Sequence, residues 1–270
     1  MYLKILLTGG GIALLTCCNA TGRREMTENH VQWDSITVDK SCYEASVNTL
    51  PSCSLQISFI YPVDLQDNAV LKSVQKQFVL DYFGNKYADM TPADAAEKYA
   101  EDYLHSVREE AAVFDDSMPA FEYYDVSDNR ILYNRNHLLS TTFSRETYRG
   151  GAHGMHVHIS RVTDLKTGQL LSEKEVFIDD YRDDLAKVIV DNLAVSNGVD
   201  NPQELENLGF FHVNEIAPNG NFYVDDAGIT YTFNEYEIAA YAIGPVTVQL
   251  AYGEVRHLLR ADGPVAAIAF

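Results

Sequence analysis

Three histidines follow a pair of glycines near the middle of the chain. The stretch Tyr-Arg-Gly-Gly-Ala-His-Gly-Met-His-Val-His contains Gly150, Gly151, His153, His156 and His158. Imidazole is the commonest metal ligand among side chains, and an H-x-H pair on a strand places both rings on one face. The three histidines are therefore weak candidates for a zinc site. A metal-dependent or other hydrolase built around His153, His156 and His158 is the alternative function that this stretch raises.

A structural role explains the same stretch more simply. Paired glycines supply backbone angles that residues with a Cβ avoid. An oxyanion hole at the glycines would need a nucleophile beside it, and the sequence contains no G-x-S-x-G elbow, no H-E-x-x-H motif and no P-loop. We expect Gly150, Gly151, Ala152 and His153 to form a turn that a His153 hydrogen bond holds, with no catalytic residue, bound metal or cofactor. His156 and His158 should then lie on a solvated strand face.

The acidic residues do not single out a second site. The cluster 179–184, Asp-Asp-Tyr-Arg-Asp-Asp, lacks the spacing of a calcium loop. Negative charge is favourable at the start of a helix, so we expect this cluster to begin the helix that follows. The 39 acids offer many carboxylate pairs for glycoside cleavage, and no pattern selects one pair.

The elements that position the histidines follow from hydrophobic periodicity. Asp67 and Thr91 are typical N-caps, and Gly84 ends the first helix. In the first half we expect strands at 34–44, 52–63, 120–127, 130–148 and 155–165, and helices at 67–83 and 91–114. The strand at 130–148 is unusually long, and we expect it to bend.

The second half repeats this mixture of elements. Ser172 and Glu175 have the spacing of a capping box, and Thr167-Gly168 predicts a turn. We expect helices at 172–177, 181–195, 201–210 and 253–260, and strands at 221–226, 229–234 and 245–252. Hairpin-like strands with helices between them predict an α+β fold of mostly antiparallel sheets packed by helices.

The first 17 residues have the pattern of a secretory signal. Lys4 precedes an apolar run over 5–15, which is about half of the ~20 residues that a membrane-spanning helix needs. The run ends in Leu-Leu-Thr-Cys-Cys, which resembles a bacterial lipoprotein box with Cys18 as the lipidated residue and Cys17 as the alternative. A plain cleaved signal is the other interpretation. Lipidation at Cys18 would anchor the protein stably to a membrane of the cell envelope.

Cys42 and Cys53 are the cysteines that remain after this segment. An exported protein meets an oxidising compartment, so we expect a disulfide between them. Closing so short a loop stabilises the fold by about 3 kcal/mol in the chain-entropy account.

The net charge of the chain limits the classes of partner that it is expected to bind. The full sequence carries −19, and removal of 1–17 leaves 19 bases against 39 acids, a net charge of −20. A nucleic-acid partner is not expected, because phosphate binding needs a basic surface. A strongly acidic protein attracts basic partners.

Three motifs together resemble a known family of extracellular domains. They are Gly-Gly-Ala-His at 150–153, Asp-x-x-Thr-Gly at 164–168, and the block 236–245 that begins Tyr-Glu-Ile-Ala and ends Gly-Pro. The chain over about 36–258 is similar to the ectodomain of RsiV-like anti-sigma factors and to the module that accompanies the catalytic domain of PdaC-type peptidoglycan deacetylases. Ala240 stands where the family usually has proline.

The resemblance implies two closely associated modules and a binding function. It divides the chain into a signal peptide (1–17), a tether (18–33), an N-terminal PdaC-type module (34–158) and a C-terminal RsiV-type module (159–262). The anti-sigma relative binds lysozyme, and the deacetylase chemistry belongs to a separate domain whose H-x-x-x-H motif is absent from this sequence. We therefore expect a non-enzymatic, lipid-anchored envelope protein that binds a lysozyme-like muramidase or peptidoglycan.

Overall fold

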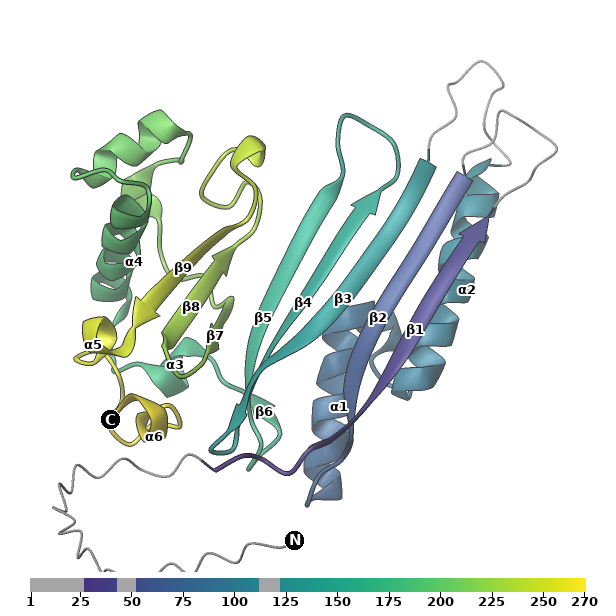
Figure 1. The fold of residues 1–270 in the computed structure, drawn as a ribbon, viewed down its shortest axis with the longest axis horizontal. Coiled ribbons are helices and arrows are strands. Elements are labelled where there is room, and N and C mark those ends of the chain that lie inside the picture. Colours follow the sequence, from purple (N-terminus) through teal and green to yellow (C-terminus); the bar gives the residue numbers. More distant parts are fainter. Residues whose placement is uncertain (1–26, 43–51, 112–121) are drawn as a thin grey trace, which may run out of the picture.

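A computed structural model describes residues 27–42, 52–111 and 122–270 of the chain. The predicted signal peptide, Cys18 and most of the predicted tether lie outside these ranges. Within them the chain forms two sheets with helices packed against them, which confirms the predicted α+β class (Figure 1).

The larger sheet has six strands in sequential order. The strands are β1 (Gln32–Cys42), β2 (Ser52–Asp64), β3 (Glu122–Arg135), β4 (Leu138–Tyr148), β5 (Met155–Asp164) and β6 (Gln169–Leu170). Neighbouring strands are antiparallel except β2 and β3, which are parallel. Parallel neighbours need a long crossover, and two helices between β2 and β3 provide it.

The two crossover helices lie where the sequence predicts them. Helix α1 (Asn68–Phe83) begins after Asp67, whose carboxylate accepts hydrogen bonds from two backbone N–H groups, and ends at Gly84. A short 3-10 turn, η1 (Asn85–Tyr87), leads to α2 (Pro92–Ala111). The Thr91 hydroxyl caps α2 by accepting from the Asp94 N–H. Both caps satisfy donors that a helix start leaves unpaired.

The first core lies between these helices and one face of the large sheet. It is rich in aromatic rings: Phe59 contacts Tyr82 at 4.5 Å and Phe83 at 5.0 Å between ring centroids. Side chains alternate across a strand, so Leu139 of β4 joins this core while its neighbour Leu138 points to the opposite face.

The expected long strand at 130–148 is wrong in one respect. The chain does not bend there but reverses direction, so that residues 130–135 continue β3 and residues 138–148 form β4. Asn136 and His137 make the two-residue turn, with φ of +54° and +63°. Turns of this kind usually carry glycine, and asparagine and histidine are among the side chains that tolerate such angles.

The second half of the chain builds the smaller sheet and its helices. The strands, in the order β7-β8-β9, are β7 (Phe222–Val224), β8 (Gly228–Phe233) and β9 (Val246–Ala251). The helices are α3 (Glu173–Val176), α4 (Arg182–Ser196), α5 (Tyr252–Val255) and α6 (Ala266–Ala269), with the 3-10 turns η2 (Pro202–Leu208), η3 (Val213–Glu215) and η4 (Tyr241–Ile243).

Local signals in this half are mostly as predicted. Ser172 and Glu175 form the capping box that begins α3, and Asp183 and Asp184 lie in the first turn of α4. The segment after Asn201 differs, because it is a 3-10 helix and not an α-helix.

The second core uses both sheets. Residues of β7–β9 and α4, such as Tyr231 and Ile189, pack with Leu138 and Val162 from β4 and β5. Figure 1 shows β7 and β8 beside β5, with α4 on the far side of the smaller sheet. The position 158/159, where the sequence divides the two modules, falls inside β5.

The predicted disulfide is present. Cys42 and Cys53 face each other at one end of the β1–β2 ladder, with 5.0 Å between their Cα atoms. No helix in the ranges that the structure covers is both long and apolar enough to cross a membrane.

Candidate functional site

The outer edge of β5 is capped by side chains from the second module. Beyond its short pairing with β6, β5 has backbone N–H groups that no further strand can bind. The Ser160 N–H donates to Asn221 (2.6 Å) and the His158 N–H to Asn234 (2.7 Å), while the amides of both asparagines donate to the His158 carbonyl. These hydrogen bonds satisfy backbone groups along a strand edge that could otherwise pair with another chain.

The expectation that this face of β5 is solvated is wrong at Ser160, whereas His156 and His158 are partly exposed. His156, His158 and Ser160 do lie on one face, but this face is turned to the second module. Ser160 is 1% exposed, and its hydroxyl lies 3.3 Å from that of Thr232. The reason is that hydrogen-bonding groups of the second module take the place of water at these positions.

The three histidines have three different environments. His158 is half-buried, and its pKa is lowered mainly by burial and also by the neighbouring His156. His153 is exposed on the turn before β5. Within the ranges that the structure describes, no three His, Cys, Asp or Glu side chains are arranged to hold a metal ion.

His156 lies between two carboxylates. Its Nδ1 is 2.6 Å from Glu235 of the second module, and its Nε2 is 3.4 Å from Glu146 of β4. The Glu235 side chain is only 8% exposed. A carboxylate and the histidine that it orients are two of the three members of a nucleophilic triad. Among the described residues no hydroxyl or thiol hydrogen-bonds to His156, and its two carboxylate contacts link β4 and β5 to the loop after β8.

The glycine turn places His153 against an aromatic loop. Gly150 and Gly151 have φ of +89° and +101°, which side chains with a Cβ rarely adopt, and the Tyr148 hydroxyl donates to the Gly151 carbonyl. Ala152 is exposed beside them. The Nδ1 of His153 is 2.8 Å from the Gly154 carbonyl, which also accepts from the Tyr241 hydroxyl.

Five rings from both modules gather around this turn. We call Tyr124, Tyr148, His153, Tyr236 and Tyr241 the junction surface. His153 stacks on Tyr241 with 3.7 Å between centroids, Tyr236 lies 5.7 Å from Tyr241, and Tyr124 stacks on Tyr148 at 5.8 Å. Tyr236 is 58% exposed and has a positive φ of 66°. The motifs 150–153 and 236–245, distant in the sequence, thus meet in space.

Because Gly154 has no side chain, the turn can lie close to Tyr124 and to the backbone of Thr147. A Cβ at Gly154 would lie 2.9 Å from the Tyr124 hydroxyl and 3.0 Å from the Thr147 carbonyl oxygen. The Tyr124 hydroxyl donates to Glu146, and this hydrogen bond raises the pKa of Tyr124 to about 12. Tyr124 is therefore a neutral hydrogen-bond donor at physiological pH.

Two tyrosines that the sequence places side by side have separate roles. Tyr123 is 4% exposed and belongs to the first core, whereas Tyr124 reaches the junction surface. Sequence reasoning missed Glu146, Asn221, Asn234 and Glu235, because their partners lie on other strands and no local pattern links them. The polar run Asn234-Glu235 directly after a buried strand was the available signal.

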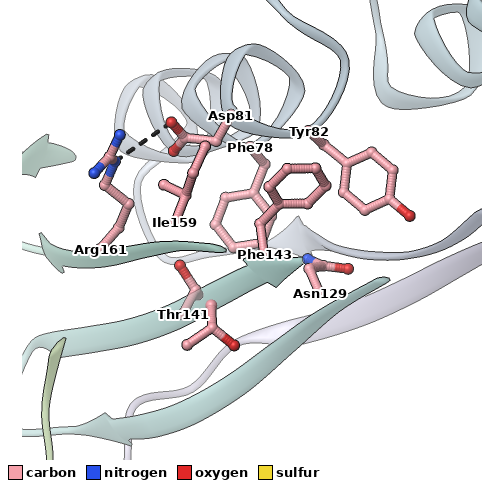
Figure 2. Close-up of a pocket in the computed structure, with 9 residues that line it drawn as sticks. Phe78, Asp81, Tyr82, Asn129, Thr141, Phe143, Ile159 and Arg161 are labelled. Atoms are coloured by element: carbon pink, nitrogen blue, oxygen red, sulfur yellow. Dashed lines mark hydrogen bonds and ion pairs between the residues drawn. The ribbon is translucent and has the colours of Figure 1, made fainter. Parts of the chain in front are cut away.

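A small cavity under α1 does not have the size of a substrate site. Its volume of about 20 Å³ has room for one water molecule. Figure 2 shows Asp81 of α1 paired with Arg161 of β5 at its side, at 3.4 Å. Burial raises the pKa of Asp81, and the Arg161 charge opposes this shift. The pair joins α1 to the sheet.

Comparisons with known proteins match the two halves of the chain separately. Residues 50–156 match the family described as deacetylase PdaC, and residues 174–253 match a protein family of unknown function, DUF3298. No curated protein matches the chain.

Solved structures show the same architecture. A DUF3298 family member from Bacteroides fragilis NCTC 9343 is 28% identical, with 90% of this chain and 98% of that chain covered and a TM-score of 0.80. A DUF3298 family protein from Pseudomonas aeruginosa PAO1 shares the fold at 12% identity, covering 86% and 96% of the two chains with a TM-score of 0.61. The chain is therefore similar to the PdaC family over residues 50–156 and to the DUF3298 family over residues 174–253.

Proposed function

We propose that this protein is a non-enzymatic binding protein of the bacterial cell envelope, anchored through a lipid on Cys18. Its junction surface binds a lysozyme-like protein. The export and anchoring rest on the apolar segment at 5–15 and the Leu-Leu-Thr-Cys-Cys sequence that follows it. The binding role rests on the resemblance to anti-sigma ectodomains and on the geometry of the junction.

One observation carries the proposal: two motifs with no local reason to be related form one exposed aromatic surface. His153 comes from the turn before β5, and Tyr236 and Tyr241 come from the loop after β8. A fold stabilised only by its cores does not need a tyrosine that is 58% exposed at a backbone angle unfavourable for its side chain.

The chemistry of this surface suits a protein partner. Tyrosine is enriched among the residues that dominate binding energy, because it combines a large apolar ring with a polar tip. Met155, beside the turn, is 63% exposed and adds apolar area. A small rigid aromatic surface of this kind suits insertion into a groove of the partner.

Charge favours a basic partner. The mature chain would carry −20, and the half-exposed carboxylate of Glu146, which accepts from Tyr124, lies at the junction surface itself. Attraction between opposite charges accelerates association and weakens as the salt concentration rises, whereas contacts between packed rings persist at high salt. Peptidoglycan is the other class of partner, and a glycan would be less sensitive to salt.

A calorimetric titration of residues 24–270 with a purified lysozyme, at low and high salt, tests the proposal. We expect saturable binding that weakens but survives at high salt, together with inhibition of lysozyme activity in a parallel assay. Heat that disappears with salt and leaves activity unchanged would indicate charge attraction only. In that case peptidoglycan fragments become the partner to titrate.

A further inference from the structure

A second hollow, separate from the junction surface, lies where the end of the larger sheet meets the helices that follow it. It has a volume of about 440 Å³ and opens between β5 and β6 on one side and α3, the start of α4 and the segment 220–222 on the other. This volume lies within the range of about 300–1,000 Å³ that is usual for small-molecule sites.

The charge of its lining is opposite to that of the chain. Three bases and one acid line the hollow, namely Arg161, Lys174, Arg182 and Glu173, in a protein whose net charge is −19. Arg161 is held by Asp81 and by the Ser160 carbonyl. Lys174 and Arg182 are exposed, and neither forms a salt bridge within the part of the chain that the structure describes.

Glu173 does not need these cations as partners. It is 8% exposed, and its two oxygens accept hydrogen bonds from the Tyr181 hydroxyl (2.8 Å) and the Gly220 N–H (2.9 Å). Hydrogen bonds from protein donors stabilise a buried carboxylate. Glu173 therefore does not occupy the guanidinium of Arg182 or the ammonium of Lys174. Glu175, whose carboxylate interacts electrostatically with Lys174, accepts hydrogen bonds from Ser172.

The wall of the hollow is apolar. Val162 and Phe222 are buried side chains that line it, and Leu170 and Leu171, which also line it, are partly exposed. A ligand that fits both surfaces has an anionic group at one end and a body with apolar faces, such as a sugar ring, at the other.

We infer that this hollow binds a small organic anion whose carboxylate or phosphate contacts Lys174 and Arg182. Arginine can bind either group through two parallel hydrogen bonds, and lysine adds a point charge. The site is independent of the junction surface, so a ligand here and a protein partner there can bind to the same molecule.

Two sugars that differ by one charged group test the inference. The full chain is titrated with N-acetylmuramic acid, which carries a lactyl carboxylate, and with N-acetylglucosamine, which does not. Inorganic phosphate serves as a third probe of the cationic rim. Binding is measured by calorimetry and by the rise in melting temperature that a ligand specific for the folded state produces.

The matched variants are Lys174→Gln/Arg182→Gln and Lys72→Gln/Lys187→Gln, which remove the same charge inside and outside the hollow. We expect N-acetylmuramic acid and phosphate to bind the wild type and N-acetylglucosamine to bind much more weakly. The first variant should lose at least about tenfold in affinity and the second should not.

The inference is overturned if neither anion binds to the wild type, or if both variants lose affinity equally. It is also overturned if N-acetylglucosamine binds as tightly as N-acetylmuramic acid. Binding of phosphate without N-acetylmuramic acid would reject an organic ligand of this kind. An unchanged melting temperature of the apo variant shows that the fold is intact.

Discussion

The first core and the junction between the modules are held together by different chemistry. Phe59, Tyr82 and Phe83 pack ring against ring in the first core, where the Tyr82 hydroxyl donates to the Ser127 carbonyl. At the junction, Asn221 and Asn234 bind the backbone of β5, and Glu235 binds His156. The core supplies stability, whereas the directed hydrogen bonds of the junction fix how the modules meet.

This difference matters for the candidate site. The junction surface takes rings from both modules, so its geometry depends on the relative position of β5 and the loop after β8. Apolar packing tolerates small shifts, but a hydrogen bond weakens steeply with angle and distance. A polar junction is therefore suited to hold Tyr241 against His153.

Removing a ring from the first core should have the largest effect on stability. Phe59 is fully buried among aromatic rings, so Phe59→Ala should lower the free energy of unfolding by about 3–5 kcal/mol. Urea denaturation measures this loss. Val126→Ala, at a position 37% exposed on β3, is the control and should cost less than about 1 kcal/mol. Equal losses in the two variants would contradict the assigned core.

Removing the disulfide should have the next largest effect. Cys42→Ala/Cys53→Ala frees the ends of a loop with a sequence separation of 11 and should lower the free energy of unfolding by about 3 kcal/mol. The wild type should lose the same amount when a reductant is added, and the variant should be insensitive to reductant. A wild type unaffected by reductant would show that the bond does not contribute.

Removing the hydrogen bonds that join β5 to the second module should destabilise the fold less than these two changes. It should alter the junction surface more. Asn221→Ala removes the bond to the Ser160 N–H and the bonds to the carbonyls of His158 and Thr232, which should cost about 1–3 kcal/mol. Hydrogen exchange at Ser160 should increase strongly. Asn192→Ala, on the surface of α4, is the control. Unchanged exchange at Ser160 would mean that Asn221 does not protect this edge.

The half-buried His158 predicts a small dependence of stability on pH. Its pKa is lowered in the folded state by burial and by His156, while Asp128 and Glu235 oppose the shift. The unfolded chain therefore takes up the proton first, and stability falls as the pH drops below about 6.5. His158→Asn should flatten the stability profile between neutral and mildly acidic pH. An identical profile in wild type and variant would assign this dependence to other groups.

Local structure was predictable because its signals are local. Asp67 and Gly84 bound α1, and Ser172 with Glu175 begins α3, as capping rules predict. The order of the strands was not predictable, since periodicity does not show that β2, besides its hairpin partner β1, also pairs with β3 in parallel. The Asn136-His137 turn was missed because it lacks the glycine that usually marks such a reversal.

The candidate site was predictable only in part. The glycine turn and His153 were evident from residue types, whereas His156 and Glu235 lie 79 positions apart and meet through tertiary structure. The expectation of a solvated strand face was wrong at Ser160 for the same reason. A polar face of a strand can be covered by another module as well as by water, and the sequence of the strand is the same in both cases.

The most direct test of the junction surface is the affinity of Tyr236→Asn for lysozyme, measured by calorimetry beside the wild type and Phe270→Ala. Asparagine tolerates the positive φ at position 236, so the change removes the ring without straining the loop. Phe270, the last residue of the chain, is also exposed and follows α6, where Figure 1 marks the C-terminus. The proposal predicts a loss of at least about tenfold in Tyr236→Asn, typical of an interface anchor, and none in Phe270→Ala. Equal affinity of all three proteins would contradict a binding role for the junction surface.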